Sequence, residues 1–268
     1  MEPPRSNPGC AASLTHLVWF SLSIAGGSLL ISWLAQFVLD LSWWKIFRRS
    51  VSVVTALTLW FFIRFVHARS IRSFGLGPWS IGRKDLLKGL LLGFGTVLVI
   101  GGVYLAAQLM RIAINSDTQR VVRTVLVSLP AMGCVAVLEE LVFRGYVLQQ
   151  LLACSQRLAV MASSAVYALV HLRPTVVWPH SAFELAGLFV LGWVLAQSVL
   201  RTKQLYLAIG LHASLAYCAR VNKLVVEFTT PSLQWLVGTN RLVNGLVAWL
   251  ALLGIGRIVA RWGRSTPR

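Results

Sequence analysis

Two adjacent glutamates, Glu139 and Glu140, lie inside the otherwise apolar stretch 129–152. The chain has only eight acidic residues in all. A charged side chain at the centre of a membrane helix costs about 3 kcal/mol on insertion scales, so such residues are rare unless they have a function. The pair is therefore the first candidate for a chemical site.

Arg144 follows Glu140 by four residues, which places both on one face of a helix. Glu139 points about 100° away from Glu140, because a helix has 3.6 residues per turn. The Glu140–Arg144 pair could simply hold the helix in place, and a catalytic and a structural role stay equally open for Glu140. Glu139 is left free to act as a general base.

Two of the five histidines, His171 and His212, lie within or at the end of apolar segments. A single histidine on an apolar face is more often an ordinary core residue, but two that accompany a buried glutamate pair could activate a water or ligate a metal. Tyr167 precedes His171 by one helical turn. We expect Tyr167 to orient that imidazole or to contact a substrate.

The composition indicates a membrane protein, because 57% of the 268 residues are hydrophobic and 12% are charged. Apolar runs of about 20 residues, enough to cross a bilayer as a helix, recur along the chain. The sequence predicts an all-α polytopic membrane helical bundle with about eight transmembrane helices. We interpret the first run as a span rather than as a cleaved secretory signal. The predicted spans are 14–39, 51–67, 86–109, 122–153, 158–172, 182–200, 204–222 and 240–260.

The net charge of +17 does not indicate a nucleic-acid partner, since the Lys and Arg residues lie in short loops between apolar runs. They are typical of topology signals, and the positive-inside rule puts both termini in the cytoplasm. In this orientation the basic groups at 45–49 and 111–123 lie on the non-cytoplasmic side, against the rule. The lipid bilayer is therefore the predicted surrounding of the chain.

The four cysteines show no Cys-x-x-Cys spacing, and Cys134 and Cys154 lie within or beside apolar runs. We expect neither a disulfide nor a structural zinc site.

The longest polar connection, 69–84, contains Gly75, Gly77 and Pro78. It predicts a division into residues 1–85, with N-terminal membrane helices and a basic loop, and residues 86–268, a membrane bundle. Further along, Gly89 and Gly93 have a spacing that permits close helix packing.

Several known catalytic motifs are absent from the sequence: His-Glu-x-x-His, Gly-x-Gly-Asp, Gly-x-Ser-x-Gly and the phosphate-binding Gly-x-x-x-x-Gly-Lys. The motifs that are present resemble those of the CPBP family of intramembrane proteases, which contains the prenyl-CaaX endoprotease and is also called the Abi family. The resemblance covers about 125–222. Its three motifs are Glu-Glu-x-x-x-Arg at Glu139–Arg144, Phe-x-x-x-His at Tyr167–His171 with Tyr replacing Phe, and His-x-x-x-Asn from His212 with Ala216 replacing Asn.

The resemblance implies a role for each matching residue. Glu139 would activate the attacking water, while Glu140 and Arg144 would hold the site together. His171 and His212 would either bind a zinc ion or stabilise the oxyanion, so a metalloprotease and a metal-free glutamate protease are both open.

Ala216 lacks the hydrogen-bond donor that the family's Asn would supply. Losing one oxyanion donor can cost about 10²–10³ in rate, so activity is uncertain on this ground. Ser214 or Asn222 could supply a donor instead.

The sequence thus predicts an intramembrane endopeptidase of the CPBP family that hydrolyses a peptide bond by a glutamate-activated water. Its substrate would be a membrane-embedded or membrane-anchored protein or peptide, such as a C-terminal tail or sorting segment, and its location a bacterial inner membrane. Two alternatives stay open: a non-catalytic membrane immunity or scaffold protein, and a proton-coupled transporter that uses the glutamate pair as a relay.

Overall fold

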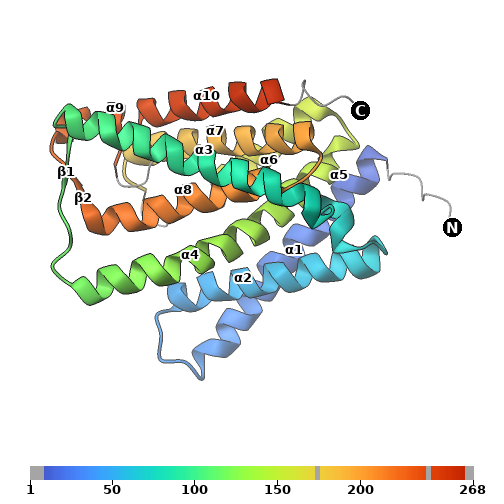
Figure 1. Cartoon of the computed structure of the whole chain (residues 1–268). Helices are drawn as coiled ribbons and strands as arrows, with labels where there is room; N and C mark the ends of the chain where they lie inside the picture. The colour runs from blue at the N-terminus through green and yellow to red at the C-terminus, as the bar shows by residue number, and fades with distance from the viewer. Residues whose placement is uncertain (1–8, 173–175, 240–242, 263–268) are drawn as a thin grey trace.

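The computed structural model describes residues 9–172, 176–239 and 243–262 and shows a bundle of long helices (Figure 1). The ends of the two predicted regions, 1–8 and 263–268, lie outside the described residues. In chain order the elements are α1 (Cys10–Gln36), α2 (Trp43–Phe61), the π-helix η1 (Phe62–Val66), the 3₁₀ helix η2 (Ile71–Phe74), α3 (Trp79–Ala106), β1 (Met110–Ile112), α4 (Thr118–Glu140), the π-helix η3 (Leu141–Val147), α5 (Leu148–Leu152), α6 (Gln156–Leu169), α7 (His180–Thr202), α8 (Tyr206–Val225), β2 (Val226–Phe228), the 3₁₀ helix η4 (Pro231–Leu233), α9 (Gln234–Val237) and α10 (Leu246–Trp262).

The predicted all-α membrane bundle is confirmed. Within the described part of the chain, 5 helical segments are long and apolar enough to cross a membrane. They are Cys10–Gln36, Trp43–Val66, Ile71–Ala106, Thr118–Leu152 and His180–Thr202. Each of the eight predicted spans overlaps a helix, but α6, α8 and α10 are not among these five. The number of eight crossings therefore stays a prediction.

Large apolar side chains point outward along the long helices. Trp19 on α1 is 61% exposed, Leu98 on α3 is 74% exposed and Leu126 on α4 is 67% exposed. Contiguous apolar surface of this kind is unfavourable in water and natural in lipid. The helices α1, α3 and α4 therefore present faces suited to a bilayer, which supports an integral membrane protein.

The helices α3 and α8 approach closely, and glycines make this approach feasible. A Cβ added at Gly89 would collide with backbone atoms of α8, and one added at Gly93 would collide with the Ser214 side chain. From the other side, a Cβ at Gly210 would collide with the backbone of α3. The predicted packing role of Gly89 and Gly93 is confirmed, and this contact fixes the helix that carries His212.

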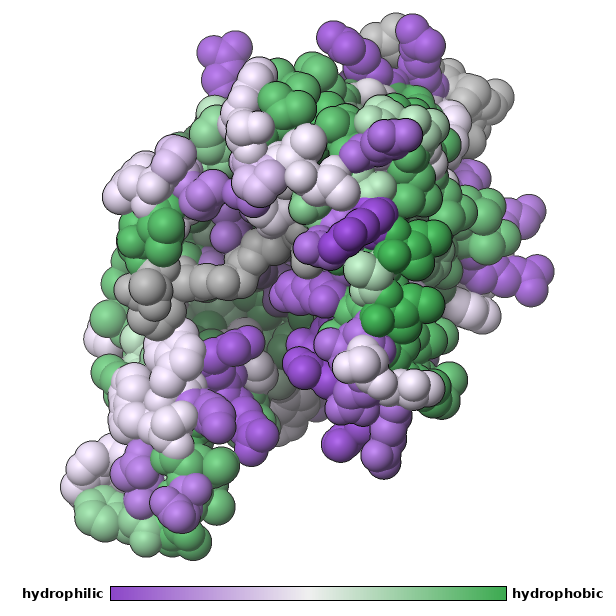
Figure 2. Space-filling view, turned by 90° about the vertical axis from the view of Figure 1, so that its left-hand side faces the viewer, coloured by the Kyte–Doolittle hydropathy of each residue, from purple (hydrophilic) through white to green (hydrophobic). Residues whose placement is uncertain are grey.

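One end of the bundle also has a short two-stranded sheet outside the predicted spans. There β1 pairs with β2 in antiparallel register, with Arg111 opposite Glu227. The two side chains form an exposed ion pair of 2.7 Å. Both strands lie in connections between long helices. The search for long apolar runs, which predicted the spans, cannot detect strands of three residues. Figure 2 shows this end with hydrophilic side chains gathered around a recess.

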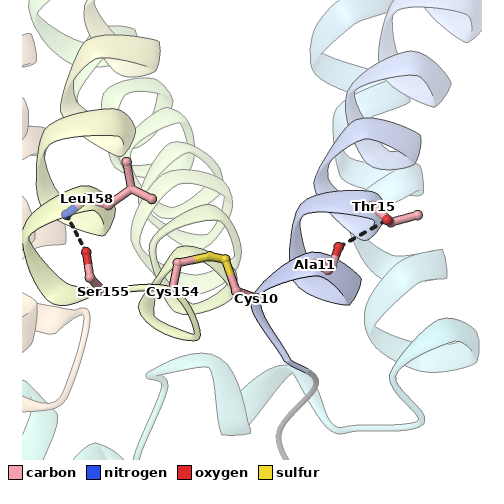
Figure 3. The surroundings of a disulfide bond; sticks show 6 residues. All are labelled: Cys10, Ala11, Thr15, Cys154, Ser155 and Leu158. Atoms are coloured by element: carbon pink, nitrogen blue, oxygen red, sulfur yellow. Dashed lines mark hydrogen bonds between the residues drawn. A yellow bond between two sulfur atoms is a disulfide. The ribbon is translucent and has the colours of Figure 1, made fainter.

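The expectation of no disulfide is wrong in the structure. Cys10, the first residue of α1, is bonded to Cys154 in the turn between α5 and α6 (Figure 3). The two residues are 144 positions apart, so no spacing rule could pair them. The bond joins the two predicted regions, whose division at about residue 85 stays a prediction. The N-terminal end of α1 and the C-terminal end of α10 lie at the same end of the bundle (Figure 1).

Candidate active site

The glutamate pair ends α4, and the helix then widens into the π-helix η3, which contains Arg144. Such π segments within α-helices are rare and often occur at functional sites. Arg144 Nη1 donates to Glu140 Oε1 at 2.9 Å, and the two side chains are 1% and 0% exposed. Arg144 Nη2 also donates to the carbonyl oxygen of Gly192 on α7, at 3.3 Å. The ion pair is thus fully buried and tied to a second helix.

His212 on α8 lies between the two carboxylates. Its Nδ1 is 2.8 Å from Glu140 Oε1, and its Nε2 is 3.8 Å from Glu139 Oε2. A carboxylate bound to an arginine accepts hydrogen bonds only, so the Nδ1 atom carries a proton and donates it to Glu140. His212 therefore belongs both to the buried ion-pair network and to the surroundings of Glu139.

His171 follows the C-terminus of α6, and its Nδ1 is 2.7 Å from the carbonyl oxygen of Tyr167. A carbonyl can only accept, so this bond fixes the proton on Nδ1 and turns Nε2 toward Glu139. The distance from His171 Nε2 to Glu139 Oε2 is 3.6 Å. Both imidazoles thus direct an Nε2 atom at the same carboxylate oxygen.

Glu139 Oε2 is buried and has no hydrogen-bond partner among the described residues. The two Nε2 atoms at 3.6 and 3.8 Å are too far for strong direct hydrogen bonds. The Glu139 side chain is nevertheless 25% exposed and that of His171 31%, compared with 7% for His212. The Glu139–His171 side is therefore the open side of the site.

Tyr167 connects the two halves of the site through its ring. The ring centroid lies 4.4 Å from the Arg144 guanidinium carbon, a cation–π contact, and 4.7 Å from the centroid of the His171 ring. The His212 ring is 6.0 Å away at a right angle. Tyr167 is only 1% exposed, so its ring positions the charged groups. Contact between Tyr167 and a substrate stays a prediction.

The structure brings together all six predicted residues, Glu139, Glu140, Arg144, His171, His212 and Tyr167, from three segments of the chain. It adds the carbonyl oxygen of Gly192, which residue types cannot reveal because every residue has one. The catalytic roles of five of these residues and the substrate contact of Tyr167 remain predictions.

Neither substitute proposed for the missing Asn is suitably placed. The Ser214 hydroxyl donates within its own helix, to the carbonyl oxygens of Gly210 and Leu211, each at 2.9 Å, and faces α3. Asn222 is ten residues beyond His212, or about 15 Å along the helix. Ala216 is one turn after His212, on the same face, and has no donor. Neither Ser214 nor Asn222 is placed to supply the missing donor, since Ser214 faces α3 and Asn222 is too distant.

The two Nε2 atoms and Glu139 Oε2 have the right chemistry for a zinc ion, but their arrangement is not a ready metal site. Within the ranges that the structure covers, no group of three or more His, Cys, Asp or Glu residues could hold a metal ion. A metalloprotease is therefore not shown. Zinc bound by His171 and His212 stays an untested prediction.

The outward apolar helices and the buried Glu–His–Arg cluster define the class: an integral membrane protein with a hydrolase-like site among its helices. Residues 121–218 match the family model described as Rce1-like, type II CAAX prenyl endopeptidase Rce1-like. This segment is similar to the CAAX-protease family that the motifs of the chain predict, and the predicted core 125–222 nearly coincides with it. The family supports an intramembrane endopeptidase in general terms. Searches of curated proteins and of solved structures gave no match.

Proposed function

We propose that this protein hydrolyses a peptide bond in the membrane and that Glu139 activates the attacking water. The observation that carries the proposal is the position of Glu139 Oε2, a buried acceptor with no partner among the described residues and with two imidazole Nε2 atoms at 3.6 and 3.8 Å. A base placed in this way can take a proton from a water held by the imidazoles.

The reaction needs one water, one base and no other reactant. The water gives a proton to Glu139 while its oxygen bonds to the peptide carbonyl carbon, and the carbonyl electron pair moves to oxygen to form an oxyanion. When the oxyanion collapses, the carbon–nitrogen bond breaks. The leaving nitrogen takes the proton from Glu139, which regenerates the carboxylate and releases an acid and an amine.

Glu140 and Arg144 have a supporting role in this proposal. Their ion pair is 0–1% exposed and lies away from the open side, so it cannot reach a substrate directly. It instead holds His212 through the 2.8 Å bond to Nδ1 and joins η3 to α7 through Gly192. The result is a fixed direction for His212 Nε2.

We further propose a membrane-embedded or membrane-anchored peptide as substrate, such as a C-terminal tail or sorting segment, and a bacterial inner membrane as location. The apolar outer faces of α1, α3 and α4 support a substrate that arrives through the bilayer. Such a peptide bond must reach the open Glu139–His171 side.

The test compares membranes that contain wild-type protein with membranes that contain Glu139→Gln, His171→Ala or His212→Ala at matched abundance. Mass spectrometry of new peptide termini should reveal one cleaved membrane protein in the wild type and its uncleaved precursor in all three variants. Unchanged processing in all three would overturn the protease proposal. Proton flux that depends on Glu139, without cleavage, would favour the transporter instead.

A further inference from the structure

A groove of about 330 Å³ opens between α6 and α7. The side chains that line it are those of Gln156, Arg157, Val160, Met161, Trp193 and Gln197. The first four belong to the start of α6, and the last two belong to the second half of α7. None of the six is a residue of the candidate active site, so the proposed reaction does not account for this groove.

The polar side chains of the groove lie at the level nearest the end of the bundle. Gln156 and Arg157 begin α6, and Gln197 lies in the last two turns of α7. Both helix ends lie at the end of the bundle where α1 begins (Figure 1). Within the described part of the chain these three side chains make no hydrogen bond or ion pair, and none of the six lining residues is acidic. The groove therefore offers one guanidinium and two amides to the oxygens of an anion.

The apolar side chains of the groove lie one helical turn further into the bundle. Val160 and Met161 follow the polar pair of α6 by four residues each, and Trp193 precedes Gln197 by four residues on α7. Met161 is 48% exposed, although its side chain is apolar. Trp193 packs against α10, where a Cβ added at Gly256 would lie 3.1 Å from the indole ring. A charged level above an apolar level has the same order as the phosphate and acyl chains of a phospholipid.

The charge of this end of the bundle has the sign that attracts anionic lipids. Arg201 and Lys203 lie at the end of α7, and Arg257 and Arg261 lie in the second half of α10. The positive-inside rule predicts that this end faces the cytoplasm, where the leaflet carries negative lipid headgroups. Arg157 is thus the basic residue of a positive surface that also lines a groove.

We propose that the groove between α6 and α7 binds one anionic phospholipid. The phosphate oxygens accept hydrogen bonds from the Arg157 guanidinium and from the amide groups of Gln156 and Gln197. An acyl chain lies along Val160, Met161 and Trp193. This binding site lies outside the proposed catalytic cluster, and it does not depend on the proposed function.

The groove adjoins the contact that holds the buried ion pair. Gly192, the residue before Trp193, accepts a hydrogen bond from Arg144 through its carbonyl oxygen at 3.3 Å. A Cβ added at Gly192 would lie 3.1 Å from the Cα atom of Ser164, so α6 and α7 pack closely beside the groove. A lipid that contacts both helices binds only their packed arrangement. Binding should therefore raise the melting temperature of the folded protein.

The experiment measures lipid binding to the purified full-length protein in detergent by native mass spectrometry. The probes are phosphatidylglycerol and phosphatidylcholine with the same acyl chains. We expect the wild type to bind phosphatidylglycerol at least about fivefold more tightly, and Arg157→Gln to reduce this preference to within about twofold. Gln197→Leu, which removes an amide without changing the charge, should weaken phosphatidylglycerol binding as well. The matched control is Arg83→Gln, which removes the same charge from an exposed residue of α3 outside the groove and should keep the preference.

Two results would overturn the proposal at this stage. An unchanged preference in Arg157→Gln would show that the lipid binds elsewhere, and an equal loss in Arg83→Gln would show attraction by the total charge alone. Thermal unfolding supplies a second test, in which phosphatidylglycerol should raise the melting temperature of the wild type more than that of Arg157→Gln. An equal rise with inorganic phosphate alone, also dependent on Arg157, would identify a free anion as the ligand and contradict the lipid proposal.

Discussion

Glu139 and Glu140 are neighbours in sequence, yet the structure gives them opposite surroundings. Glu140 is fully buried, and one of its oxygens binds both Arg144 at 2.9 Å and His212 at 2.8 Å. Glu139 is 25% exposed, and its nearest imidazole nitrogen is 3.6 Å away. A rotation of about 100° between adjacent helical residues is enough to separate an anchored carboxylate from a reactive one.

This difference shows how a membrane helix can carry charge without losing stability. The anchored carboxylate compensates the charge of the arginine, and the arginine joins η3 to α7 through its hydrogen bond to the Gly192 carbonyl oxygen. Buried pairs of this kind add little net stability, but removing one partner is costly because the other charge stays buried. Among the described residues no lysine or arginine forms an ion pair with the reactive carboxylate, so its lone pairs stay available for water.

The largest expected effect comes from Glu139→Gln. The amide keeps the shape of the side chain but cannot accept the water proton, so peptide cleavage should fall by about 10²–10⁴-fold. The amount of folded protein should stay close to wild type, since Glu139 makes no strong hydrogen bond in the site. A cleavage assay with immunoblotting of the membrane fraction measures both. Retained cleavage would place the base elsewhere.

Glu140→Ala should lower the stability of the protein, because Glu140 is the anchored carboxylate of the pair. It leaves Arg144 unpaired in the bundle, a change that costs about 3–5 kcal/mol for a buried ion pair, so the protein should accumulate poorly. Glu139→Ala, as the matched variant, should accumulate normally. Equal levels of the two variants in the membrane fraction would contradict this division of roles.

Replacing the two histidines should also have different effects on stability, although the difference should be smaller than that between the two glutamates. Both His212→Ala and His171→Ala should lose cleavage, but only His212→Ala should lower the melting temperature measurably. His212 is 7% exposed and bonded to Glu140, so its loss leaves a buried acceptor with one partner fewer, at about 1–3 kcal/mol. His171 is 31% exposed. Equal melting temperatures of the variants in detergent would show that His212 is not part of the anchor.

The smallest effect on chemistry should come from the cysteine pair. Replacing both Cys10 and Cys154 by serine removes the link between α1 and the turn after α5 (Figure 3). Neither cysteine is one of the six site residues. The melting temperature should fall, because the bond restricts the unfolded chain, while kcat should stay within about twofold of wild type. A large loss of kcat would mean that α1 helps to shape the site.

Side-chain chemistry made most of the site predictable from sequence. Glutamates, an arginine and histidines stand out in an apolar chain because each is costly there, so Glu139, Glu140 and His212 could be recognised without a structure. Their meeting at one place could also be estimated from helical rise. The membrane bundle followed from the length of the apolar runs.

The remaining features depend on contacts that no local pattern records. The carbonyl of Gly192 contributes through the backbone, and the Cys10–Cys154 bond joins residues 144 positions apart. Ser214 was a plausible donor by residue type, but the close approach of α3 and α8 turns it toward Gly93. Helix packing, not residue identity, decides each of these cases.

The most direct test measures cleavage and thermal unfolding of Glu139→Gln and Glu140→Gln side by side, in the same detergent preparation. The account predicts that Glu139→Gln unfolds at the wild-type temperature without cleaving, and that Glu140→Gln unfolds at a lower temperature because Arg144 loses its counter-charge. The opposite pattern, with Glu139→Gln active or Glu140→Gln as stable as wild type, would contradict the assignment of Glu139 as base and Glu140 as anchor.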